Sequence, residues 1–154
     1  MSLEVHAPLS GTLAALGNVP DPVFAAQMVG SGMAVEPADA RRPVDVAAPV
    51  SGQVTVVRPH AFVIVAEGGA AVLVHLGIDT VRLNGEGFRT HVSEGERVEV
   101  GRHVITFDPH AVRARGLSAI CPVVVLDSAP GSAQAPSAGG PIRAGALMFS
   151  WAAS

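Results

Sequence analysis

The chain has 154 residues and a mass of 15.6 kDa, and 49% hydrophobic against 15% charged residues is enough apolar material for the core of one domain. Its net charge of −3 contains no long block of one sign, so neither nucleic acid nor an anionic membrane surface is an expected partner. No apolar stretch reaches the roughly 18 residues that cross a bilayer, and residues 1–6 do not resemble a signal peptide, so we expect a cytoplasmic protein. The absence of lysine excludes Walker-type phosphate loops, Schiff-base catalysis and biotinyl or lipoyl arms.

Short runs of Val, Ala, Ile and Leu are separated by 17 glycines and 12 prolines, which favours many short strands over a helical bundle. We therefore predict an all-β fold, an antiparallel β-sandwich or barrel-like domain that covers residues 1–154. Residues 7–11 read Ala-Pro-Leu-Ser-Gly and recur as Ala-Pro-Val-Ser-Gly at 48–52, each time before an alternating run. This repetition predicts duplicated strand-turn-strand units. Two further short strands are expected at 97–100 and 104–107.

Two short helices are expected between the strands. Asp21-Pro22 can cap and begin a helix of about two turns that ends at Gly30, and Asp108-Pro109 begins a second one that stops at Gly116. Residues 128–140 are too small and polar to pack and predict a flexible loop. The apolar run at 146–151 predicts a final strand, which places this loop inside the domain.

The pair His60 and His75 is the most informative feature for chemistry. Apolar runs at 61–66 and 70–74 flank Glu67-Gly68-Gly69 and predict a β-hairpin. A turn at 67–68 puts the two imidazoles directly opposite, with Cβ atoms roughly 4.5 to 5.5 Å apart, and a turn at 68–69 makes them diagonal neighbours at about 7 Å. A three-residue loop would put them on opposite faces. Two of the three turns thus predict a histidine pair on one face.

Three chemistries suit two neighbouring imidazoles. A zinc site needs a third and usually a fourth ligand, and Asp79 is the one nearby candidate. A general base needs a nucleophilic hydroxyl, for which no serine elbow can be placed. In the third, one imidazole takes a phosphoryl group while the other donates a hydrogen bond to its oxygens, which requires neither lysine nor metal.

The remaining candidates each have a simple structural explanation. Cys121 stands alone and is expected to be a buried, inert thiol. Asp79 is equally well explained as a turn residue that caps Thr80. The apolar positions of the first helix are typical of ordinary core, and no partner can be derived for the other histidines, which are His6, His91, His103 and His110.

Residues 72–88, which read VLVHLGIDTVRLNGEGF, resemble the glucose-type enzyme IIA domain of the bacterial phosphoenolpyruvate-dependent sugar phosphotransferase system. The resemblance runs from about residue 4 to the final strand. It is supported by matches at 19–24, 29–35, 48–52, 60–61 and 98–108.

The resemblance implies a β-sandwich in which His75 accepts a phosphoryl group from the phosphohistidine of the carrier HPr and passes it to a cysteine of a sugar-specific IIB domain. It implies that His60 supports the phosphoryl group without carrying it, and that Asp21 and Asp79 meet arginines of the partners. No cofactor is required, although the two histidines can recruit zinc at a partner interface. The remaining supporting residues are Gly77, Thr80 and Arg58, and the implied apolar docking surface comprises Val23, Phe24, Met28, Val29 and Leu73.

The chain departs from the family pattern at two positions. Arg58 stands where relatives usually carry a threonine that orients an imidazole, and it can instead add positive charge beside the phosphoryl group. Arg82 stands where an acidic residue is common, so partner preference can differ. The sugar stays open among glucose, N-acetylglucosamine and β-glucosides, because specificity resides in other components.

Two alternatives compete with the phosphocarrier hypothesis. His75-x-x-x-Asp79 has the spacing of lysostaphin-type zinc metallopeptidases, but their His-x-His motif is absent. The same fold could instead serve a regulator that binds transporters or kinases according to its phosphorylation state.

Overall fold

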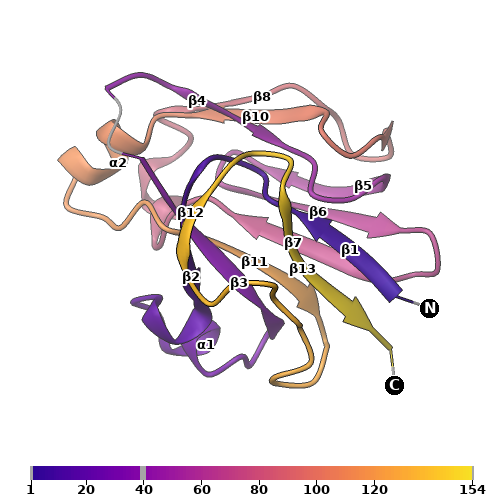
Figure 1. The fold of residues 1–154 in the computed structure, drawn as a ribbon. Helices are drawn as coiled ribbons and strands as arrows, with labels where there is room; N and C mark the ends of the chain where they lie inside the picture. The colour runs from indigo at the N-terminus through magenta and orange to yellow at the C-terminus, as the bar shows by residue number, and fades with distance from the viewer. Residues whose placement is uncertain (1, 39–40, 154) are drawn as a thin grey trace.

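The computed structural model describes residues 2–38 and 41–153, and it is built almost entirely from antiparallel strands (Figure 1), as the all-β prediction requires. An eight-stranded sheet has the order β12-β2-β3-β11-β7-β6-β5-β9, a three-stranded sheet the order β4-β10-β8, and β1 pairs with β13. The strands are β1 (Ser2–His6), β2 (Gly11–Ala15), β3 (Gly30–Pro37), β4 (Val44–Ala47), β5 (Gly52–Arg58), β6 (Ala61–Ala66), β7 (Ala71–His75), β8 (Phe88–Thr90), β9 (Arg97–Val98), β10 (His103–Phe107), β11 (Cys121–Leu126), β12 (Gly140–Ile142) and β13 (Leu147–Ala152).

The five-residue sequence that occurs at 7–11 and again at 48–52 marks a structural repeat. The amide of Ala7 donates to Ala146 O at 2.8 Å just before β13, and the amide of Ala48 donates to Arg102 O at 2.8 Å just before β10. Each copy then continues into a strand of the large sheet, β2 or β5. Both copies therefore make the same kind of backbone contact, which confirms the predicted duplication.

The strands bury two apolar clusters on opposite faces of the large sheet. Alternate residues of β11 separate them, since Val123 and Val125 belong to the main core whereas Val124 belongs to the smaller cluster. The smaller cluster also contains Phe24 and Ile78, which flank the end of β7. Cys121, the first residue of β11, is fully buried, and this burial raises the pKa of its thiol to about 12, in agreement with the predicted inert cysteine.

The helices are short: η1 (Leu16–Asn18), α1 (Pro22–Ala25), η2 (Thr80–Leu83) and α2 (Pro109–Ala114). Asp108 caps α2 as predicted, but the expectation of a two-turn first helix is wrong. Asp21 does cap α1, yet the helix stops at Ala25 because Gln27 adopts a left-handed conformation with φ 57°. The chain after Gln27 leads directly into β3.

The C-terminal region follows the prediction with one addition. Residues 128–139 are irregular, and Gln134 forms an isolated bridge with Ser150 of β13. The end of the predicted loop forms β12, a strand that the sequence did not predict, because Gly140-Pro141 is a poor strand signal. No helix among the residues that the structure describes is both long and apolar enough to cross a membrane.

Candidate functional site

The imidazoles of His60 and His75 lie side by side. Their ring centroids are 5.1 Å apart and the planes make an angle of 74°. Both rings are partly exposed, so an incoming group can reach them. The predicted histidine pair therefore exists in the structure.

The predicted strand register, however, is wrong. Ala61 pairs with His75, and residues 67–69 form a three-residue loop. With such a loop, positions 60 and 75 would lie on opposite faces of the sheet if both belonged to strands. The rings still meet because His60 is not a strand residue. It lies with Pro59 in the turn between β5 and β6, outside the alternation, and its carbonyl oxygen accepts the amide of Leu76 at 2.7 Å.

The protonation of His75 is set by the backbone that follows it. Nδ1 lies 2.6 Å from Gly77 O, and since a carbonyl oxygen can only accept, Nδ1 carries the proton and Nε2 keeps its lone pair. Gly77 has φ +78°, and a Cβ there would lie 2.7 Å from Thr80 Cγ2 and 2.9 Å from Ser118 O. The buried Thr80 hydroxyl in turn donates to Leu76 O at 2.7 Å. This short segment thus holds the imidazole in one orientation.

Both imidazoles favour the neutral form. Burial lowers the pKa of His75 and outweighs the hydrogen bond to Gly77 and the nearby carboxylates of Asp21 and Asp79, which raise it. Burial also lowers the pKa of His60, and repulsion from His75 and then from Arg58 lowers it further. Near neutral pH the pair offers one imidazole as a nucleophile and one as a neutral hydrogen-bond donor.

The two acidic residues of the predicted site have different settings. Asp21 is committed to the start of α1, where Oδ1 accepts the amides of Val23 at 2.9 Å and Phe24 at 3.3 Å. Asp79 is exposed and lies in the bend before η2 with φ 61°, as expected of a turn residue, but its side chain makes no capping bond there, so the predicted capping of Thr80 is wrong. Its carboxylate is available to a partner.

Arg58 ends β5 and forms an ion pair that the sequence did not predict. Nη1 lies 3.0 Å from Glu94 Oε2, in the turn between β8 and β9. The two residues are 36 positions apart in the sequence, which leaves no local signal for their contact. Arg82 is exposed on η2.

Comparison with known proteins agrees with this geometry. A family model described as "phosphoenolpyruvate-dependent sugar phosphotransferase system, EIIA 1" matches residues 3–130. The chain belongs to this family. It is 45% identical over 125 residues to a glucose-specific EIIA component of Halalkalibacterium halodurans, which covers 80% of this chain and 70% of the relative. A glucose-specific EIIA component of Oceanobacillus iheyensis is 42% identical over 128 residues, 82% of this chain and 75% of the relative.

A solved structure extends the match to nearly the whole chain. The glucose permease IIA of Mycoplasma capricolum superposes with a TM-score of 0.84 at 32% identity, and the match covers 97% of this chain and 96% of that one. This EIIA component is therefore a phosphotransferase component, a phosphocarrier of a sugar phosphotransferase system, with the expected β-sandwich fold. The comparisons give the metallopeptidase alternative no support.

The predicted docking surface of the EIIA component divides into exposed and buried residues. Met28 and Val23 are 73% and 43% exposed, whereas Phe24 is only 8% exposed. The centroids of the Phe24 and His75 rings are 5.3 Å apart, so Phe24 packs against the imidazole instead of offering a free surface. Val29 and Leu73 are partly buried. Val81, which the predicted surface does not include, is 62% exposed two residues beyond Asp79.

Among the described residues no group of three or more His, Cys, Asp or Glu side chains can hold a metal ion, so the histidine pair alone does not fit the usual zinc site.

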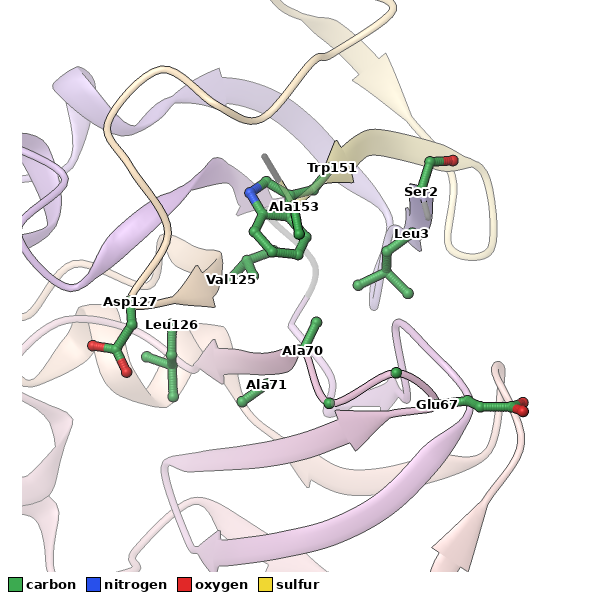
Figure 2. Close-up of a pocket in the computed structure, with 12 residues that line it drawn as sticks. Ser2, Leu3, Glu67, Ala70, Ala71, Val125, Leu126, Asp127, Trp151 and Ala153 are labelled. Atoms are coloured by element: carbon green, nitrogen blue, oxygen red, sulfur yellow. The ribbon is translucent and has the colours of Figure 1, made fainter.

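A cavity of about 430 Å³ is lined by Leu3, Ala70, Val125 and Trp151 (Figure 2). It lies at the Ala71 end of β7, whereas His75 is at the other end.

Proposed function

We propose that His75 is the phosphoryl acceptor of this EIIA component and that His60 supports the phosphoryl group. The observation that carries the proposal is the hydrogen bond from Nδ1 to Gly77 O, which leaves Nε2 as the nucleophilic nitrogen beside a second imidazole. The Nε2 lone pair attacks the phosphorus of the phosphohistidine of HPr. The donor N–P bond breaks, and its electron pair returns to the donor imidazole.

The second transfer reverses these roles. A cysteine thiolate of a IIB domain attacks the phosphorus, an S–P bond forms, and Nε2 of His75 leaves with its lone pair. While the phosphoryl group is on His75, the neutral His60 donates one N–H to its oxygens and Arg58 supplies positive charge nearby. The Gly77 carbonyl stabilises the positive charge that a phosphorylated imidazole gains.

Both partners use one surface. HPr and IIB in turn cover the exposed Val23 and Met28, while Asp21 and Asp79 meet arginines of the partners.

The proposed setting is the cytoplasm. The proposed sugar is glucose, because two relatives at 45% and 42% identity are named glucose-specific EIIA components. Phosphoryl transfer to the IIB domain of an N-acetylglucosamine or β-glucoside permease, and not to that of a glucose permease, would contradict the assignment to glucose.

Transfer requires no cofactor in this scheme. The two imidazoles supply two ligands, so a zinc ion there would need further ligands from a bound partner. Purified phospho-HPr should therefore label the chain to the same extent with and without EDTA.

Labelling with phosphate tests the proposal. After incubation with phosphoenolpyruvate, enzyme I and HPr, mass spectrometry should locate an acid-labile phosphate on His75. His75→Ala should abolish the label, whereas His60→Gln should accept phosphate but deliver it slowly to IIB. A label on another residue, or a normal label on His75→Ala, would refute the assignment.

A further inference from the structure

Glu94 is a charged residue beside the site for which the proposed function has no role. Its Oε2 accepts the Val57 amide at 3.0 Å and Arg58 Nη1 at 3.0 Å. β9 pairs only with Gly52 and Gln53 of β5, so the Val57 amide lies on an edge that β9 does not cover. Both contacts lower the pKa of Glu94, which keeps the carboxylate charged. One carboxylate oxygen thus satisfies an edge amide and holds the Arg58 guanidinium, whose Nη1 also donates to Val57 O at 3.1 Å.

Arg58 and His75 lie in the same cross-strand row. Arg58 pairs with Ala61 across β5 and β6, and Ala61 pairs with His75 across β6 and β7. Directly paired residues share a face, so both side chains project from the same side of the sheet with Cβ atoms about 10 Å apart. The intervening residue is an alanine, whose side chain is too short to separate them. An extended arginine side chain can reach a group bound to Nε2 of His75.

Glu94 and a phosphoryl group on His75 are therefore alternative partners for Arg58. The pair with Glu94 is solvent-exposed, with 60% and 50% of the two side chains accessible, and such pairs are weak. A phosphoryl group carries more negative charge and three acceptor oxygens, which an arginine can bind through two N–H groups. The phosphoryl group is the stronger ligand.

We propose that Glu94 holds Arg58 in the unphosphorylated protein and releases it to the phosphoryl group on His75. This inference rests on the proposed phosphorylation of His75. Glu94 then acts as a positioning residue through Arg58: it competes with the phosphoryl group and limits how tightly His75 retains it. Removing Glu94 and removing Arg58 should therefore have opposite effects.

The equilibrium with phospho-HPr tests this competition. The phosphorylated fraction, read by intact mass, gives an equilibrium constant for each variant. Arg58→Met should lower it about tenfold, with Arg58→Lys intermediate because it keeps the charge. Glu94→Gln keeps an oxygen for the Val57 amide but loses the charge, and should raise the constant about threefold. In the Arg58→Met background, Glu94→Gln should have no effect.

Glu96→Gln is the matched control. Glu96 lies in the same turn but pairs with Arg102 at 2.9 Å, so its loss should leave the equilibrium unchanged. An effect of Glu94→Gln that is equal with and without Arg58, or that lowers the constant, would overturn the proposal. So would an Arg58 Nε–H resonance that does not shift when the wild type is phosphorylated. Failure of the proposed function looks different, because the wild type would then carry no label on His75.

Discussion

Nδ1 of His75 and the carbonyl oxygen of Gly77 are 2.6 Å apart, and this contact decides which ring nitrogen can take part in chemistry. The acceptor is main chain, so it cannot rotate away or change its charge. The geometry of residues 76–80 is therefore part of the proposed phosphoryl-transfer site.

Gly77→Ala should destabilise the protein and slow its phosphorylation. The new Cβ meets Thr80 Cγ2 at 2.7 Å and Ser118 O at 2.9 Å, and the positive φ adds strain. Gly131→Ala is a matched control, because Gly131 has the same φ of +78° but nothing within 4 Å. We expect Gly77→Ala to cost about 1–3 kcal/mol more than the control in urea unfolding. Equal costs would show that contact with Thr80 and Ser118 is unimportant.

Thr80→Val should remove a buried hydrogen bond at nearly constant volume. Leu76 O then loses its 2.7 Å partner, and we expect a loss of about 1–3 kcal/mol in the free energy of unfolding. The exposed Thr55 of β5 provides the comparison, since Thr55→Val should change stability by less than about 0.5 kcal/mol. Denaturant titration of both variants measures the difference, and two equally stable variants would contradict it.

The free energy of unfolding should fall as pH decreases below 6.5. The pKa values of His60 and His75 lie below their ordinary value of 6.5 in the folded protein, so the unfolded chain binds more protons at these sites in this range. Their contribution is therefore complete above pH 6.5 and is lost on acidification towards the folded pKa values. Urea titrations at several pH values should show a shallower dependence for the double variant His60→Gln/His75→Gln. An unchanged slope in that variant would exclude these imidazoles as its source.

Met28→Asp should weaken docking without weakening the fold. Met28 is 73% exposed, so a carboxylate there costs little stability but places an uncompensated charge in the proposed contact surface. We expect a raised KM for phospho-HPr with the unfolding midpoint nearly unchanged. Val100→Asp alters a residue that is 44% exposed on the turn before β10 and should leave KM unchanged. The same KM in wild type and Met28→Asp would remove this residue from the docking surface.

Phe24→Ala, unlike Met28→Asp, should weaken the fold. Its ring is 8% exposed and lies 5.3 Å from His75, so truncation leaves a cavity under the imidazole. We expect a loss of about 3–5 kcal/mol in the free energy of unfolding, measured by urea titration. Phe24→Leu, which fills more of the space, should recover a large part of that loss. A variant Phe24→Ala as stable as the wild type would mean that this ring is not part of the core.

Local signals predicted the fold well, and contacts between distant segments explain what they missed. Asp108-Pro109 predicted the start of α2 because a cap and a proline act on their own neighbours. The loop at 67–69 could not be assigned, since two consecutive glycines permit several turns. His60 reaches His75 through the turn at 59–60, whose residues lie outside the strand alternation on which the hairpin prediction depends. Phe24 was assigned to the docking surface by resemblance, and only the packing of α1 on the sheet shows that it is buried.

The place of β7 in the large sheet bears on how fast phosphate can move through this protein. β7 has hydrogen-bonded neighbours on both sides, β6 and β11, and His75 is its last residue. An imidazole mounted on such a strand cannot travel, so we expect the donor to dissociate before the acceptor arrives. The turnover rate would then depend on how long HPr and the IIB domain each stay bound, and not on any motion within this chain.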